Sequence, residues 1–165
     1  MRECGERELD RLWGWVRCAF LLPCALLAQG YAESAVGWEI EVVDNGKQFS
    51  NMTDRSLRLD AQGHPHVAYG EDWLYYGFFD GLEWHYEVAD SSPRVGQYAS
   101  LALDSSGCPH ISYYDERNGD LKYACREAAG WYTQTIDATG DVGLSTSITL
   151  GSSGLPRISY SDRSG

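Results

Sequence analysis

A chain of 165 residues is long enough for one domain with a buried core. Its formal net charge of −11 at pH 7 argues against nucleic acid and anionic membranes as partners, because both repel an acidic surface. Aromatic residues make up 13% of the chain and there are 18 glycines, a composition typical of short strands joined by tight turns.

The first 32 residues have the pattern of a secretory signal. Val16–Ala28 is apolar but too short to span a bilayer, and Gly30-Tyr31-Ala32 offers a cleavage pattern of small residues around Tyr31. We therefore expect residues 1–32 to be a signal peptide. The mature chain, residues 33–165, is then secreted, periplasmic or on the cell surface, without insertion into a membrane.

The beginning of this leader departs from the pattern. Met1–Arg17 holds four acidic residues and four arginines, whereas a signal peptide normally begins with a net positive charge. Translation is therefore expected to begin near Val16, which would make residues 1–15 a mis-assigned start.

Beyond the leader the chain repeats with a period in the middle forties. The landmark residues of Ser100–Asp137 recur 44 residues upstream and 47 residues downstream. The recurring landmarks are Ser56, Leu57, Leu59, Asp60, Gly63, Pro65 and Tyr69 before this stretch, and Ser147, Ile148, Leu150, Gly154, Pro156 and Tyr160 after it. Such a period indicates a repeat architecture in which similar units stack on one another.

Strands can be placed along these units in chain order. Trp38–Asp44 is predicted as a single strand equivalent to the last strand of a unit. The central unit predicts four short antiparallel strands, at 101–103, 109–115, 121–127 and 131–137, which is the pattern of a β-propeller blade. The last unit stops after a second strand, Pro156–Asp162, so the fold class is all-β with two full blades plus partial ones, an incomplete ring.

The pairing of these strands can also be predicted. In the central unit we expect Asp115 to face Leu121, which would place Tyr113 and Tyr123 on one face of the sheet. The upstream unit is expected to follow the same rule, with Tyr69 opposite Tyr76. Large residues of one sheet would then fill the space beside small residues of the next. In this register Cys108 and Cys125 point to opposite faces, so we expect free, mostly buried thiols.

The repeat also resembles one from known proteins. The string SLALDSSGCPHISYYD at 100–115, followed by GDLKYA at 119–124, resembles a repeat of exported bacterial β-propeller proteins. The resemblance covers roughly residues 38–165 and implies a β-propeller fold. It implies no chemistry, because no catalytic residue set accompanies the repeat. A more distant similarity to sialidase-type propellers rests on the turn and tryptophan at Asp80–Trp84 and Glu127–Trp131.

In a propeller, the loops between blades lie at the same end as the hairpins between second and third strands. We call this the loop end, and the opposite end, with its repeated Asp-x-x-Gly turns, the turn end. The loop end has the longer and more varied loops, so it is the predicted binding face. The candidate binding residues there are Trp73, Arg94, Gln97, Tyr98, Glu116, Arg117 and Asn118. Their aromatic rings could stack on sugars, although packing between blades is the alternative for such rings.

Metal ligation has weaker support. His64-Pro65-His66 and Cys108-Pro109-His110 could bind a metal, but they recur with the repeat and lack the ligand spacing of zinc sites. The turns Asp60–Gly63 and Asp104–Gly107 need no ion if the aspartate caps its own backbone and the glycine takes positive φ. We therefore expect no metal, no cofactor and no catalytic residues.

Together these features predict an exported binding or scaffolding module for a glycan or protein ligand, rather than an enzyme. One alternative is a fragment of a sialidase-like enzyme that acts on glycans, because Arg94 and Arg117 lie with Glu116 at the loop end. The other alternative is a non-functional gene fragment.

Self-association is a further expectation. An incomplete ring leaves an unpaired strand edge and apolar faces without neighbours, and both features drive association. Tyr69, Tyr76 and Phe78 are the residues expected to have too few packing partners.

Overall fold

The structure is a computed structural model, and it describes residues 15–21, 38–45, 47 and 50–164. The chain divides into two compact units, Met1–Lys47 and Gln48–Gly165. All regular elements of the described residues are strands, which confirms the all-β fold class. No helix in this part of the chain has the length and apolarity needed to cross a bilayer.

In the first unit the described residues form a two-stranded antiparallel sheet. β1 (Trp15–Leu21) pairs with β2 (Trp38–Asn45). The predicted strand at Trp38–Asp44 is therefore present, but it is paired rather than single. β1 falls within the predicted leader, whereas the predicted cleavage residues 30–32 lie outside the described residues, so the signal peptide stays a prediction.

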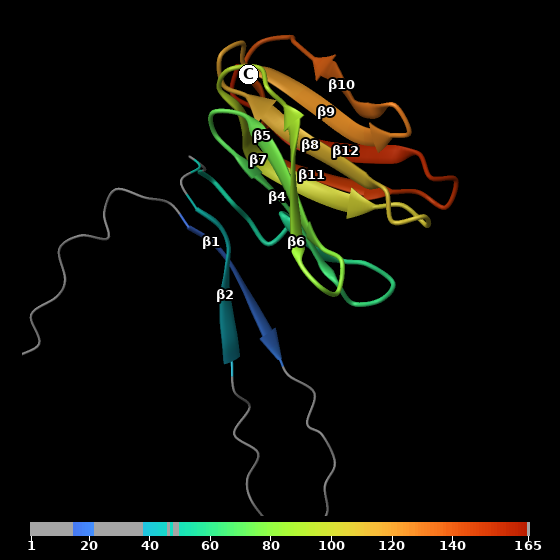
Figure 1. The fold of residues 1–165 in the computed structure, drawn as a ribbon. Helices are drawn as coiled ribbons and strands as arrows, with labels where there is room; N and C mark the ends of the chain where they lie inside the picture. Colours follow the sequence, from blue (N-terminus) through green and yellow to red (C-terminus); the bar gives the residue numbers. More distant parts are fainter. Residues whose placement is uncertain (1–14, 22–37, 46, 48–49, 165) are drawn as a thin grey trace, which may run out of the picture. The chain divides into compact units, whose positions relative to one another are not determined.

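The second unit contains three antiparallel sheets (Figure 1). The first sheet consists, in order, of β3 (Leu57–Leu59), β4 (Pro65–Gly70), β5 (Leu74–Phe79) and β6 (Trp84–Asp90). The second consists of β7 (Val95–Leu103), β8 (Pro109–Asp115), β9 (Asp120–Glu127) and β10 (Gly130–Asp137). The third consists of β11 (Val142–Leu150) and β12 (Pro156–Asp162). Consecutive strands are neighbours throughout, so two four-stranded sheets match the predicted units.

The register of the central hairpin differs by one residue from the prediction. Asp115 lies opposite Asp120 rather than Leu121. Because successive side chains of a strand alternate between faces, this shift moves every side chain of β9 to the other face. Tyr113 and Tyr123 therefore lie on opposite faces, and the prediction that they share one is wrong.

The cause of the shift is the turn between β8 and β9. Asp115 Oδ1 accepts hydrogen bonds from the backbone N–H groups of Arg117 and Asn118, both at 3.1 Å. Gly119 N–H donates to Asp115 O at 2.8 Å, and Gly119 has φ +75°. This side-chain cap closes the loop with one residue fewer than predicted, because glycine adopts the left-handed backbone at low cost. The first sheet shows the same slip, with Tyr69 opposite Tyr75.

The first and second sheets pack face to face around a shared apolar core. Tyr76 of the first sheet belongs to the same buried cluster as Leu101 and Ile111 of the second. Burying side chains of this size stabilises the fold by about 1.5–3 kcal/mol each. Tyr69 and Tyr76 are only 1% and 3% exposed, so the expectation that they would lack packing partners is wrong.

The third sheet covers the other face of the second sheet. Tyr123 packs there with Ile148, and Cys125 lies at the edge of this cluster. The backbone N–H of Ile148 donates to Ser100 Oγ at 3.1 Å, which ties the two sheets together. Cys125 and Cys108 are free thiols as expected, but both are half-buried rather than mostly buried.

A hydrogen bond between an aspartate and a tyrosine recurs at each junction of sheets. Tyr113 OH donates to Asp90 Oδ2 at 2.6 Å, and Tyr160 OH donates to Asp137 Oδ2 at 2.7 Å. In both cases the last strand of one sheet is joined to the second strand of the next. The spacing of 47 residues between the two pairs shows that the repeat preserves contacts between sheets as well as strands.

The first strands of the three sheets lie on the same side of the stack. The backbone N–H of Leu101 in β7 donates to Arg55 O, next to β3, at 2.8 Å. The guanidinium of Arg55 reaches Ser145 O of β11 at 3.1 Å. Arg55, which precedes β3, is thus hydrogen-bonded to both β7 and β11, the first strands of the second and third sheets.

Candidate functional site

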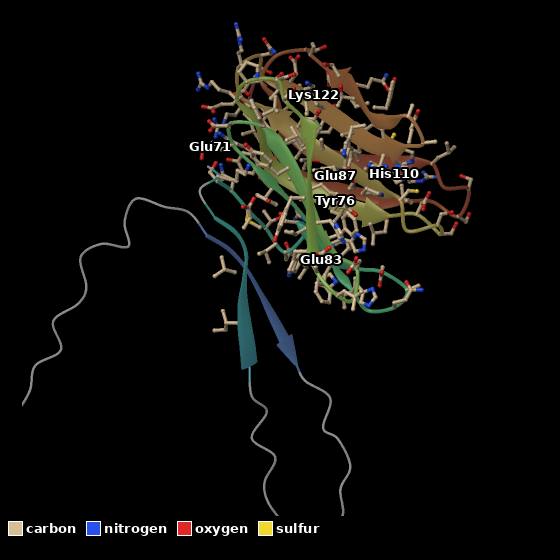
Figure 2. All side chains as sticks on the ribbon, in the orientation of Figure 1. Glu71, Tyr76, Glu83, Glu87, His110 and Lys122 are labelled. Carbon is tan, nitrogen blue, oxygen red and sulfur yellow. The ribbon has the colours of Figure 1, made fainter. Side chains whose placement is uncertain are left out.

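Two regions of the second unit have features of a site, one at each end of the sheets. Figure 2 marks these ends on the first sheet: Glu71 lies in the β4–β5 loop at the loop end, and Glu83 lies in the β5–β6 turn at the turn end. The predicted binding residues belong to the loop end.

The loop end repeats an uncommon backbone conformation. Asn51, Tyr98 and Ser145, at intervals of 47 residues, have left-handed φ values of 54°, 55° and 50°. Tyr98 and Ser145 lie in bulges of β7 and β11, where the pairing with β8 and β12 shifts. Residues other than glycine disfavour this conformation, and it collects at binding sites. No glycine signalled it in the sequence, so it escaped prediction.

A polar network connects three of the candidate residues. Glu116 accepts hydrogen bonds from Arg94 Nη2 at 2.6 Å and from Gln97 Nε2 at 2.8 Å. Gln97 Oε1 in turn accepts from Asn51 Nδ2 at 3.3 Å. Gln97 is buried, whereas the Arg94 side chain is 61% exposed. The Gln97 amide at the buried side of the network is therefore held in place, whereas the Arg94 guanidinium is exposed to solvent.

Trp73 is held beside this network with its ring exposed. Trp73 is 42% exposed, and the centroid of its ring lies 6.4 Å from that of the Tyr75 ring. The backbone around it is tightly packed, because a Cβ on Gly96 would lie 2.9 Å from Trp73 O. Arg94 N–H also donates to Asp72 O at 2.8 Å. An aromatic surface on a fixed backbone is suited to binding a ligand without much loss of entropy.

The remaining candidate binding residues, Tyr98, Arg117 and Asn118, lie outside this hydrogen-bond network. Tyr98 contacts Tyr114 edge to face, with ring centroids 6.2 Å apart. Tyr114 OH donates to Asp141 at 2.5 Å, and burial together with this aspartate raises the pKa of Tyr114 to about 12. Arg117 is exposed, whereas the Asn118 amide donates to Asp115 within its own turn. The structure thus joins Arg94, Gln97 and Glu116 directly, and leaves Asn118 occupied in the turn.

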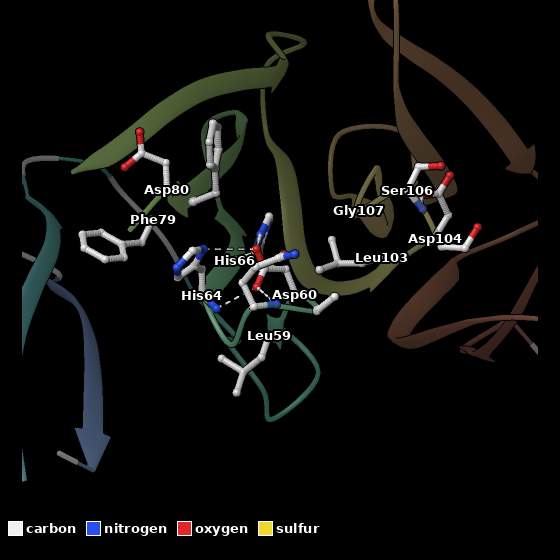
Figure 3. A pocket seen from close by; sticks show the side chains of 14 residues that line it. Leu59, Asp60, His64, His66, Phe79, Asp80, Leu103, Asp104, Ser106 and Gly107 are labelled. Carbon is white, nitrogen blue, oxygen red and sulfur yellow. Dashed lines mark hydrogen bonds and ion pairs between the residues drawn. The ribbon is translucent and has the colours of Figure 1, made fainter. Parts of the chain in front are cut away.

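The turn end holds a cavity of about 640 Å³ between the first and second sheets. Figure 3 shows Asp60 and His64 of the β3–β4 turn with His66 of β4 on one side of it, and Leu103 at the end of β7 with Asp104 of the β7–β8 turn on another. The end of β5 also contributes to the wall. This volume is within the range of about 300–1,000 Å³ that small-molecule sites occupy.

The two aspartate turns that line the cavity have the geometry predicted for them. Asp60 Oδ1 accepts from the backbone N–H groups of Gln62 and His64 at 2.9 and 2.7 Å, and Gly63 has φ +87°. Asp104 caps its turn in the same way. The prediction that aspartate and glycine shape these turns is confirmed.

Each of these turns connects to a histidine and a tyrosine of its sheet. His66 Nδ1 is hydrogen-bonded to Tyr76 OH, and its Nε2 lies 3.7 Å from Asp60 Oδ2. His110 Nδ1 lies 2.5 Å from Tyr123 OH in the second sheet. Burial lowers the pKa of His66, which keeps its ring neutral at pH 7. The histidines recur as structural members of the first and second sheets, as expected from the repeat, whereas Arg157 takes this position in the third.

The cavity itself was not foreseen. Sequence reasoning treated the turn end as structural, because each turn and each histidine could be explained by the repeat. The repeat did not explain the two adjacent aromatic residues at the end of β5, Phe78 and Phe79, and these could have indicated an aromatic wall of the cavity. Within the described residues, no group of three or more His, Cys, Asp or Glu side chains is placed to hold a metal ion.

Comparison of the chain with protein-family models, curated proteins and solved structures finds no match.

Proposed function

We propose that the second unit is a series of β-propeller blades that binds a glycan at its loop end and does not catalyse a reaction. Three features support the propeller arrangement. The sheets stack face to face, the Asp–Tyr hydrogen bond recurs at both junctions, and Arg55, which precedes β3, is hydrogen-bonded to both β7 and β11. Loops at one end of stacked blades are a common location for binding sites.

The observation that carries the glycan assignment is the partly exposed Trp73, whose backbone packs against Gly96, two residues from Arg94 of the Arg94–Glu116 ion pair. A sugar presents an apolar C–H face and a rim of hydroxyl groups. The indole can cover the apolar face, while the guanidinium donates to hydroxyl oxygens and the carboxylate accepts from hydroxyl groups. Because Gln97 and the close approach of Gly96 hold these groups in place, little ordering is needed on binding.

A glycan array probed with the full chain tests this proposal. We expect binding to a limited set of glycans that Trp73→Ala reduces by at least about tenfold, because a stacking ring is a typical hot spot. Tyr132→Ala is the matched control: Tyr132 is 46% exposed on β10, outside the loop-end cluster, and its loss should not change binding.

The same protein on a panel of fluorogenic glycosides separates binding from catalysis. We expect no turnover above a buffer blank. Turnover that Glu116→Gln abolishes would replace the binding proposal with the enzyme alternative, and absence of binding to every glycan would contradict the proposal directly.

A further inference from the structure

The cavity at the turn end is distinct from the proposed glycan site and has its own chemistry. Its lining has acidic side chains but no strongly basic ones: Asp60, Asp80 and Asp104 contribute carboxylates, and the lining contains neither lysine nor arginine. The two imidazoles there belong to His64 and His66, and burial keeps His66 neutral at pH 7. A concave surface of this kind concentrates a negative potential.

Two of these carboxylates, those of Asp60 and Asp104, are fixed in position and have one oxygen without a close partner. Both oxygens of Asp80 are occupied, because Oδ1 accepts from the N–H groups of Leu82 and Glu83 and Oδ2 lies 2.7 Å from His85 Nε2. In Asp104, Oδ1 accepts two backbone hydrogen bonds at 2.8 Å, from Ser106 and Cys108. Asp104 Oδ2 lies 3.9 Å from His110 Nε2, which is beyond hydrogen-bond distance. Asp60 Oδ2 has only longer contacts, at 3.3 Å to His64 Nδ1 and 3.7 Å to His66 Nε2. The outer oxygens can therefore accept from a charged donor without disturbing the turns.

Aromatic rings form a wall next to these oxygens. The His66 ring stacks on Phe78 with centroids 5.8 Å apart, and the His64 ring meets Phe79 edge to face at 6.1 Å. Leu103 adds an apolar surface from the second sheet. Such a wall suits an aliphatic stem, and aromatic faces also attract a cation.

We propose that this cavity binds an organic cation, an ammonium or guanidinium group on an aliphatic stem, with the charge at Asp60 and Asp104 and the stem along Phe78 and Phe79. The cation is organic rather than metallic because, among the described residues, no group of three or more carboxylates, imidazoles or thiols is placed to hold a metal ion. Its source is a free amine or a lysine or arginine side chain of a peptide, since both present the same chemistry.

Isothermal titration calorimetry on the full chain at low salt tests the proposal with two cationic probes. n-Pentylamine represents the free amine, and an acetylated pentapeptide with one central lysine among glycines represents the side chain. Their neutral counterparts are 1-pentanol and the same peptide with norleucine. We expect saturable binding of at least one cationic probe, the tighter one identifying the source, and much weaker binding of its neutral counterpart.

Asp104→Asn is the informative variant. Asparagine keeps an oxygen that accepts the two backbone hydrogen bonds of the turn, so the fold is retained while the charge is lost. The affinity for the cationic probe should fall at least about tenfold, the effect of losing a charge-assisted hydrogen bond. Asp162→Asn is the matched control, because Asp162 caps the N–H of Ser164 in a similar turn away from the cavity. It should leave the affinity unchanged.

Three results would overturn the proposal. Neither cationic probe binds, the neutral probes bind as tightly as the charged ones, or Asp104→Asn retains the affinity of the unmodified chain. A titration with calcium chloride adds a fourth: saturable calcium binding that is lost in Asp104→Asn would identify a metal site instead. Each outcome is independent of whether the loop end binds a glycan.

Discussion

At the scale of single residues, Asp90 forms a buried junction between the first and second sheets. Its Oδ2 accepts from Tyr113 OH at 2.6 Å and from Lys122 Nζ at 2.5 Å. Burial alone would raise the pKa of Asp90, but hydrogen bonds from Lys122, Tyr113 and Ser92 outweigh it and lower the pKa. A buried charge depends on its partner, because removal of one partner leaves the other charge without compensation.

The variant Lys122→Met should therefore reduce the free energy of unfolding by about 3–5 kcal/mol, the typical loss when a buried ion pair is broken. Urea denaturation monitored by tryptophan fluorescence measures this loss. Arg126→Met is the control, since its pair with Glu87 is much more exposed and should contribute about 0–1 kcal/mol. Equal losses in both variants would contradict the role assigned to the buried pair.

Histidine protonation predicts a pH dependence of stability. Burial lowers the pKa of both His66 and His110, whose rings face Asp60 and Asp104 and are bonded to Tyr76 and Tyr123. Below pH about 6.5 the unfolded chain binds more protons at these histidines than the folded chain does. The free energy of unfolding should therefore be fully kept above this pH and should decrease as the pH falls below it.

Urea denaturation at pH about 7.5 and about 5.5, on either side of the ordinary histidine pKa, measures this dependence. His66→Gln removes one of the two titrating rings and should make the decrease smaller. The difference in free energy of unfolding between the two pH values is taken for each protein separately, so that a loss of packing that does not depend on pH cancels before the two proteins are compared. The same decrease in both proteins would show that His66 does not contribute.

At the scale of strands and turns, the sequence was most informative where local chemistry sets the structure. Pro109–Asp115 and Pro156–Asp162 have the predicted bounds, because proline and Asp-Gly turns mark where a strand can begin and end. The register was wrong because the hydrogen bonds of one side chain, Asp115, decide the length of the loop. The bulge at Tyr98 places a residue other than glycine at a left-handed φ of 55°, and the residue type at this position does not signal it.

The close approach of two elements at Gly96 can be tested by adding one methyl group. Gly96 has φ +104°, and a Cβ there would lie 2.9 Å from Trp73 O, a backbone atom that cannot rotate away. Gly107 has φ +81° but no atom within 4 Å of its Cβ position. Gly107→Ala should cost about 1–2 kcal/mol from the backbone alone. Gly96→Ala should cost at least about 1 kcal/mol more because of the added overlap.

Thermal denaturation of both variants, followed by circular dichroism, measures the difference. A loss in Gly96→Ala no larger than that in Gly107→Ala would mean that the β4–β5 loop and β7 are not in close contact. The loop end would then lack the rigidity on which the glycan proposal depends.

At the scale of the whole molecule, the sequence predicted the stacked antiparallel units but not the location of the cavity. The period of the repeat identifies which residues occupy equivalent positions in successive units. It therefore also predicts which loops lie at the same end of the sheets, and the loop-end candidates were chosen from those loops. The cavity depends on the distance between turns of neighbouring sheets, near Asp60 and Asp104, and a repeat pattern contains no information about that distance. The predicted ring of blades remains a proposal.

Self-association is a prediction at this scale. Among the described strands, β12 is hydrogen-bonded to β11 alone, and Tyr160 and Leu155 near this edge are 40% and 67% exposed. We expect size-exclusion chromatography with light scattering to give a mass above that of one chain, increasing with concentration. Ser159→Lys places a charge on the exposed strand and should shift the protein toward monomer, whereas Ser105→Lys at the turn end should not. A single monomeric mass at all concentrations would contradict the prediction.

The central claim is that the loop end is the glycan-binding face, and amide chemical-shift mapping tests it most directly. An isotope-labelled full chain would be titrated with a glycan selected on the array. We expect shift changes to concentrate at Trp73, Arg94, Gln97 and Glu116, including the Trp73 indole N–H, while Asp60 and Asp104 are unaffected. Shift changes confined to the turn end, with none at the loop end, would contradict it.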